Sequence, residues 1–267
     1  MFYQDSLGYG LTRFYEWALS KGDPRVADWP LMASPVATLS IFFMYIFTVR
    51  QGPRLMEAQK AMDISAAIVI YNAGLVLLSA YMCYEFLVTS ILAGYSYVCQ
   101  PTNYSNDPLA LRMANVCWWY FFSKIIELVD TGFHILRKRP VSFLHAYHHS
   151  TMLLNWWLGV KYVAGGQSWF LAMLNTFVHV IMYSYYALSA LGPSVRPYLW
   201  WKKYLTILQL SQFVAVVIHT GTNMLQPDCE FPQGFNYAVF MYAISLIVLF
   251  TNFYIKTYNK KASQKTS

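Results

Sequence analysis

Seven apolar runs, each close to the length that crosses a bilayer, restrict what this sequence can fold into. A hydrocarbon core of about 30 Å needs about 20 helical residues, and only helices or closed barrels satisfy their backbone there. Hydrophobic residues make up 57% of the 267 residues and charged residues 12%, which excludes an ordinary soluble domain. The sequence predicts an all-α integral membrane protein with seven transmembrane helices over residues 31–49, 64–92, 111–135, 143–163, 168–191, 204–226 and 235–256.

The basic residues indicate an orientation, because Lys and Arg accumulate in cytosolic loops. With seven alternating spans, thirteen of them fall on one side and five, among them Arg25 and Lys161, on the other. We therefore expect a lumenal N-terminal segment over residues 1–30, a membrane domain over 31–258 and a cytosolic basic tail over 259–267. The net charge of +7 then reflects topology and predicts no nucleic-acid partner. Residues 1–30 contain no basic region leading into an apolar run, so no cleaved signal peptide is expected.

Two predictions follow for the lumenal side. Cys99 and Cys229 would share an oxidising compartment and are expected to form a disulfide, with reduced thiols as the alternative. Asn103 begins the sequon Asn-Tyr-Ser in the same loop and is a candidate glycan acceptor, although sequons also occur by chance. Cys83 and Cys117 fall within spans, where packing is the expected role.

Polar side chains recur at helical spacing within four of the apolar runs. Such groups are costly at membrane depth, so they mark a functional site. The string HAYHH places His145, His148 and His149 on one side of a helix near its cytosolic end. Similar stripes on three other spans are Lys124, Glu127 and Asp130; Asn175, His179 and Tyr183; and Thr206, Gln209 and Gln212. Because these stripes reach a common depth, we expect a polar active-site cavity enclosed by the later six helices.

Several alternatives stay open at this point. The Thr206 stripe could serve hydrogen bonds between helices, and the Lys124 stripe could be a structural ion-pair network. An HxxHH box also occurs in membrane di-iron desaturases and hydroxylases, but those enzymes bring further histidine boxes, whereas this chain has one box and six histidines in all. We therefore expect no metal. A seven-span receptor would share the topology and the disulfide, although the polar residues here lie toward the cytosolic half.

Four strings together resemble the signature boxes of the very-long-chain fatty acid elongase family. They are KIIELVDT (124–131), HAYHH (145–149), NTFVHVIMYSYY (175–186) and TILQLSQF (206–213), in the family's order and spacing. The similarity runs from about Asp23 to Tyr258. Further strings look similar to the type-four branch, namely WPLM (29–32), AGYSYVCQ (93–100), VAGGQ (163–167) and NFYIKTY (252–258).

The resemblance implies a multi-pass enzyme of the endoplasmic reticulum membrane, a 3-oxoacyl-CoA synthase without a cofactor. It would condense a long-chain or very-long-chain acyl-CoA with malonyl-CoA and release carbon dioxide and CoA. The expected partners are the bilayer, these two substrates, a second copy or other elongases, and the reductase and dehydratase of the elongation cycle.

The roles of the polar residues are then expected as follows. Cys117 lies about 20 Å along the helix axis from Asp130, so a histidine, His148 in the first place, would attack the acyl-CoA in a ping-pong mechanism. Groups that polarise the thioester and stabilise an enolate would be His145, His149, His179 and Asn175. Asp130 or Glu127 would orient a histidine, and Lys124 would balance these carboxylates. Substrate contacts are expected from Tyr183, Thr206, Gln209 and Gln212, and contacts to the CoA phosphates from Lys202, Lys203 and Arg137, whose alternative role is to set topology.

Overall fold

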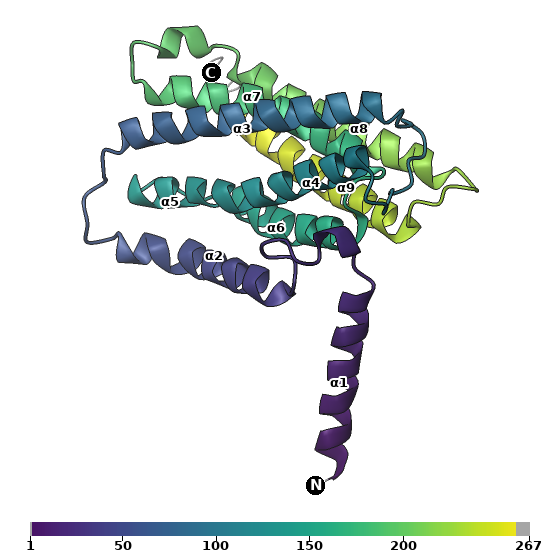
Figure 1. Ribbon diagram of the computed structural model, residues 1–267. Helices are drawn as coiled ribbons and strands as arrows, with labels where there is room; N and C mark the ends of the chain where they lie inside the picture. Colours follow the sequence, from purple (N-terminus) through teal and green to yellow (C-terminus); the bar gives the residue numbers. More distant parts are fainter. Residues whose placement is uncertain (1, 260–267) are drawn as a thin grey trace.

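The computed structural model describes residues 2–259 (Figure 1), and this part of the chain folds into helices without a strand. Its α-helices are α1 (Phe2–Ser20), α2 (Pro35–Leu55), α3 (Ser65–Leu92), α4 (Pro108–Glu127), α5 (Val129–Leu136), α6 (Phe143–Val163), α7 (Ser168–Ala190), α8 (Lys202–Met224) and α9 (Gln233–Tyr254). Short 3₁₀ turns cover Pro24–Val26 and Arg196–Leu199, and a π-helical turn covers Ile255–Asn259. The predicted tail lies outside the described residues beyond Asn259.

Each of the seven ranges predicted to span the membrane contains a helix, with α4 and α5 sharing one range. Among the described residues, four helices are long and apolar enough to cross a membrane. They are α3, α7, the stretch Arg196–Met224 that includes α8, and α9 with its continuation to Tyr258. Helices α4 and α6, which carry the Lys124 stripe and the HAYHH string, are not among these four. The chain is therefore a helical, multi-pass membrane protein.

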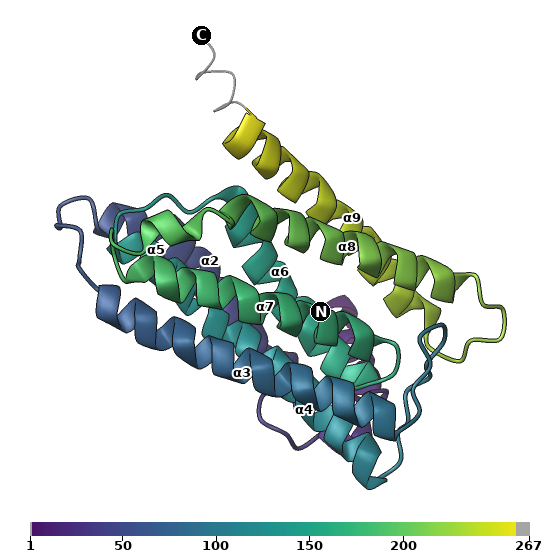
Figure 2. The same cartoon turned by 90° about the horizontal axis from the view of Figure 1, so that it is seen from above.

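Successive helices from α2 to α9 alternate in direction, with α5 continuing α4, so the bundle has two ends (Figures 1 and 2). We call one the disulfide end, which holds the loops 93–107, 164–167 and 225–232, and the other the basic end, which holds the loops 56–64, 137–142 and 191–201. Helix α3 packs along α7, and α8 packs along α9. The largest core lies where α3, α4, α6 and α7 meet, around Phe86, Phe121, Leu153 and Trp169, each at most 1% exposed.

Local signals start the helices that carry the polar stripes. Asp107 caps α4 by accepting a hydrogen bond from the Leu109 backbone, and a proline follows it at the first helical position. Ser142 caps α6 in the same way. This cap places the HAYHH string in the first two turns of α6, at the basic end.

The predicted third span is not one continuous helix. Helix α4 ends at Glu127 and α5 begins at Val129, with short-range bonds from Leu128 N to Ile125 O (3.2 Å) and from Thr131 N to Leu128 O (3.2 Å). In such a tighter turn, side chains three residues apart overlie one another. Lys124, Glu127 and Asp130 therefore stay on one side across the interruption, where Glu127 lies beside His179 and Asp130 beside Tyr183, both on α7.

Two basic residues that were counted as loop charges are buried at the disulfide end. Lys161 is 3% exposed within α6, and its Nζ donates to Met32 O at 3.0 Å. Arg25 pairs with Asp23 and donates to the carbonyl oxygens of Ala110 (3.1 Å) and Ala164 (2.8 Å). These residues fasten the segment after α1 to the bundle, so their charge carries no topology signal.

A disulfide joins Cys99 to Cys229, the pair that the sequence predicts, with the Cα atoms 5.8 Å apart. It ties the loop between α3 and α4 to the loop between α8 and α9. Asn103 lies exposed in the first of these loops, and its Oδ1 accepts a hydrogen bond from Ser105 N at 2.9 Å. Glycosylation of Asn103 stays a prediction.

Replacing Cys99 by serine is expected to destabilise the protein. The bridge links residues 130 positions apart, and its loss costs about 2–4 kcal/mol because the unfolded chain gains freedom. Thermal unfolding of the purified protein in detergent measures the effect. Cys83→Ser, which removes a free cysteine, is the control and should unfold as the wild type does. Unfolding of Cys99→Ser at the wild-type temperature would contradict the prediction.

Candidate functional site

A buried ion pair closes the end of α4. Lys124 Nζ lies 2.7 Å from Glu127 Oε1, and both side chains are only 2% exposed. The same oxygen accepts a hydrogen bond from Ser123 Oγ at 3.3 Å and lies 3.5 Å from His179 Nδ1 on α7. Charge-assisted bonds of this kind compensate two charges that would otherwise be costly to bury. The ion pair therefore holds His179 in place.

Asn175 on α7 connects this ion pair to α8. Its Oδ1 accepts a short hydrogen bond from the Tyr120 hydroxyl and faces Lys124 Nζ at 3.4 Å. Its Nδ2 faces Gln212 Oε1 on α8 at 3.5 Å. Two donors on the oxygen fix the orientation of the amide, so its NH₂ group points toward Gln212 and the interior. Asn175 is thus a positioned hydrogen-bond donor.

The three histidines of HAYHH have different surroundings. His145 Nε2 lies 2.8 Å from Thr131 Oγ1 on α5, and its ring centroid is 4.3 Å from that of His149. The rings of His148 and His149 are 5.6 Å apart. The buried Nδ1 of His148 has no hydrogen-bond partner within residues 2–259. Of the three imidazoles, His145 is the one held by a hydrogen bond to another side chain within the described residues.

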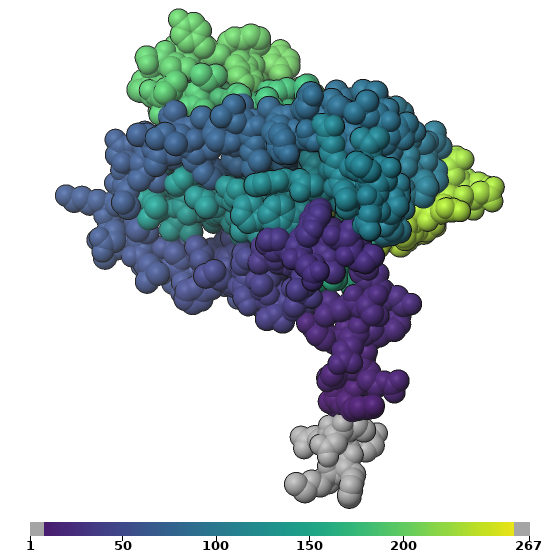
Figure 3. All heavy atoms as spheres, in the orientation of Figure 1, coloured from purple at the N-terminus to yellow at the C-terminus, as the bar shows by residue number. Residues whose placement is uncertain are grey.

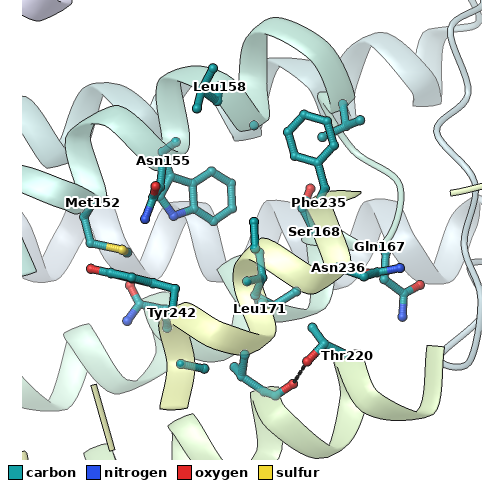
Figure 4. A pocket seen from close by; sticks show the side chains of 18 of the residues that line it. Met152, Asn155, Leu158, Gln167, Ser168, Leu171, Thr220, Phe235, Asn236 and Tyr242 are labelled. Carbon is teal, nitrogen blue, oxygen red and sulfur yellow. Dashed lines mark hydrogen bonds between the residues drawn. The ribbon is translucent and has the colours of Figure 1, made fainter. Parts of the chain in front are cut away.

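An apolar cavity of about 390 Å³ extends from these polar groups toward the disulfide end. Its polar inner end is formed by Tyr120, His148, Asn175 and Gln212, and most of its wall is apolar, for example Met152, Leu171, Phe213, Val216 and Phe235. Figure 4 shows side chains of α6, α7, α8 and α9 converging on this space. Among the described residues, His148 is the one histidine that lines it.

This cavity differs from the predicted one in two respects. The prediction was a polar cavity enclosed by the later six helices, whereas the cavity is mostly apolar and none of the residues in α3 lines it. It also extends toward the disulfide end instead of lying between mid-bundle and the basic end. The reason is that the polar stripes meet at one end of the space, while aromatic and aliphatic residues that look like ordinary core form the rest of its wall.

Several predicted site residues lie outside this cavity. The Tyr183 hydroxyl donates to Asp130 Oδ2 at 3.3 Å, one helical turn beyond Glu127. Thr206 contacts Tyr258 at 3.3 Å, and Gln209 contacts Met182 Sδ at 3.3 Å. The expectation that the whole Thr206 stripe faces one cavity was therefore wrong, since only Gln212 lines it. Lys202 and Lys203 are exposed and Arg137 is partly exposed at the basic end.

Two residues of the site were not predicted. Tyr120 is 1% exposed, bonds to Asn175 and packs edge to face against Trp156, with ring centroids 4.3 Å apart. Thr131 Oγ1 shares one hydrogen bond with His145 Nε2 and a second, at 3.1 Å, with the Tyr45 hydroxyl. Tyr120 lies four residues before Lys124, on the same face of α4, and this spacing was the available signal.

The arrangement suits chemistry on the polar head of a long apolar molecule. The apolar part would fill the cavity, and its polar end would meet the His148 imidazole and the Asn175 amide. Within residues 2–259, no three His, Cys, Asp or Glu side chains are grouped so that they could hold a metal ion.

Comparison with known proteins connects this site to a family. Residues 30–266 match the GNS1/SUR4 (ELO) family. The chain is 51% identical over 257 residues to very long chain fatty acid elongase 4 of Mus musculus, covering 96% of this chain and 82% of that protein. It is 46% identical to very long chain fatty acid elongase 7 of Drosophila melanogaster over 94% of this chain and 78% of that protein. With very long chain fatty acid elongase 5 of Xenopus laevis it shares 46% identity, over 97% of this chain and 88% of that protein. These matches confirm the predicted resemblance, and the chain belongs to the GNS1/SUR4 family of elongases.

Proposed function

We propose that this protein is a 3-oxoacyl-CoA synthase that joins a long-chain or very-long-chain acyl-CoA to malonyl-CoA. The observation that carries the proposal is an apolar cavity whose polar end holds His148, Asn175 and Gln212. Membership of the elongase family supports the same reaction class. The proposal includes seven membrane-spanning helices, a lumenal N-terminus and a place in the endoplasmic reticulum membrane.

The acyl chain would occupy the cavity. Each buried methylene contributes about 0.8 kcal/mol, so the apolar wall between α6 and α9 favours long chains over short ones. The thioester would then lie beside His148. CoA is highly charged and stays at the basic end, where the proposed contacts are Lys202, Lys203 and Arg137.

The first half of the reaction forms an acyl-imidazole. A ring nitrogen of His148 attacks the thioester carbonyl, a C–N bond forms, the C–S bond breaks, and CoA leaves as a thiol after taking up a proton. The developing oxyanion needs a fixed donor. Asn175 Nδ2 supplies it, because Tyr120 and Lys124 occupy its oxygen and so hold the amide in that orientation.

The second half uses malonyl-CoA. Loss of carbon dioxide leaves an enolate, whose α-carbon attacks the acyl carbonyl while the His148 nitrogen leaves. The product is a 3-oxoacyl-CoA that is two carbons longer. His179, held against Glu127, and the neighbouring His145 and His149 are proposed to stabilise the negative charge of the enolate. Asp130, bonded to Tyr183, is proposed to support this cluster from the basic end.

Incubation of the purified protein with acyl-CoA and malonyl-CoA tests the function. The expected result is a 3-oxoacyl-CoA whose formation requires both substrates. Acyl-CoA alone should release one equivalent of free CoA and leave an acyl group on a histidine. Product without the early release of CoA would favour a direct reaction of both substrates. Binding of an acyl ligand without any product would overturn the enzyme proposal and favour a seven-span receptor.

A further inference from the structure

Helix α1 is amphipathic, although the residues around it look mixed and polar. Between Gly8 and Ser20 its polar side chains, spaced by three and four residues, form one stripe, namely Thr12, Arg13, Glu16 and Ser20. The opposite face carries Leu11, Phe14, Trp17 and Ala18 at the same spacing. A helix with this pattern requires an apolar environment on one side and water on the other.

Within the described part of the chain, the bundle leaves the apolar face of α1 uncovered. Leu11 and Phe14 are each 63% exposed and Trp17 is 56% exposed. The contacts that hold the helix come from its last turns: the Tyr162 hydroxyl donates to Ala18 O at 3.1 Å, and the Tyr15 hydroxyl lies 2.9 Å from Ser34 Oγ. Figure 3 shows the described part of α1 standing clear of the bundle on this side.

The direction of α1 relative to the membrane spans indicates which surface its apolar face contacts. Helix α3 has 28 residues and is one of the candidate membrane spans, so its axis of about 42 Å follows the membrane normal. Figure 1 shows α1 running across the direction of α3. Helix α1 joins the bundle at the disulfide end through Asp23, whose backbone N donates to Lys161 O at 2.7 Å. It therefore lies parallel to the membrane plane, at the level where the spans emerge.

We propose that α1 is an interfacial helix whose partner is the phospholipid surface of the leaflet at the disulfide end. Leu11, Phe14 and Trp17 enter the region between headgroups and acyl chains, and Arg13 and Glu16 face water. Tryptophan and tyrosine favour this depth, and amphipathic helices bind there through their apolar face. The interaction fixes the orientation of the segment that is fastened to α4 and α6 by Arg25. It is independent of the proposed reaction.

Site-specific fluorescence in proteoliposomes tests this inference. Phe14→Cys and Glu16→Cys, each in a Cys83→Ala and Cys117→Ala background that keeps the disulfide, carry an environment-sensitive NBD label in phosphatidylcholine vesicles. The label at position 14 is expected to show a blue-shifted emission and quenching by lipids with a nitroxide near the headgroup, whereas position 16 keeps a water-like emission. A water-like emission at both positions would overturn the proposal. Cross-linking of two copies through position 14, without lipid quenching, would also overturn it and assign the face to a second copy.

Amide hydrogen exchange provides a test that needs no label. In vesicles, the backbone amides of residues 8–20 in the unmodified chain are expected to exchange slowly. A variant with both Phe14→Glu and Trp17→Glu should exchange fast in this segment, while the bundle exchanges as before. Fast exchange of residues 8–20 in the unmodified chain would place α1 in water and overturn the proposal.

Discussion

Replacing His148 by alanine is expected to abolish both the condensation and the release of CoA from acyl-CoA alone. His148 is the histidine that lines the cavity, and its Nδ1 has no hydrogen-bond partner within the described residues. Loss of a covalent nucleophile removes the intermediate itself, so a decrease in kcat of at least about 10³-fold is expected. Single-turnover measurement of free thiol and mass analysis of the acylated peptide provide the readout.

Two histidine variants make this test specific. His149→Ala should slow the reaction but still leave an acyl group on the protein, because His149 contacts the other imidazoles without lining the cavity. His219→Gln should react at the wild-type rate, since His219 lies near the disulfide end, where it bonds to Gln167 at 2.7 Å. An acyl adduct that persists in His148→Ala and disappears in His149→Ala would assign the nucleophile to His149.

The positions of the membrane helices could be predicted from the sequence because apolar runs and short charged loops alternate along the chain. The ranges 143–163 and 168–191 agree with α6 and α7 to within one residue at each end. The pairing of Cys99 with Cys229 followed from the same reasoning, since the four spans predicted between the two loops place both loops on one side. These features depend on composition along the chain, which a single sequence shows directly.

The wall of the cavity could not be predicted in this way. Phe213 and Phe235 line an open space, yet an aromatic residue on a helix looks the same in sequence whether it faces a cavity or a packed core. Conversely, Thr206 and Gln209 were expected to face the cavity because their helical spacing matched that of Gln212, but neither lines it. Their hydrogen bonds go to Tyr258 and Met182 instead, because a regular spacing places side chains on one face but does not show which neighbour fills it.

The interruption at Leu128 and the amphipathic pattern of α1 were missed for a different reason. The tight turn between α4 and α5 contains no glycine or proline, so the local sequence does not predict it. In α1 the mean hydropathy is low, and averaging over a window hides a polar stripe that occupies only one side of the helix. Arg25 and Lys161 show the same limit of averaging, because a count of charges treats buried and exposed residues alike.

Replacing Lys124 by methionine is expected to cause a large loss of stability. The change leaves the Glu127 carboxylate without its main partner at a position where both side chains are 2% exposed. Breaking a buried ion pair from one side costs about 3–5 kcal/mol, because the remaining charge stays desolvated. The thermal unfolding of the detergent-solubilised protein measures the loss. Replacing both residues, with Lys124→Met and Glu127→Gln in one chain, removes the uncompensated charge and should recover most of it.

A second ion pair in the same chain provides the matched control for this prediction. Arg112 Nε lies 2.6 Å from Glu85 Oε2, but the Arg112 side chain is 34% exposed. Water and ions therefore screen this pair, and Glu85→Gln should cost less than about 1 kcal/mol. If Lys124→Met proves as harmless as Glu85→Gln, the Lys124–Glu127 pair does not stabilise the fold. If the double replacement is as unstable as Lys124→Met alone, the loss comes from packing of the lysine chain and not from the unpaired carboxylate.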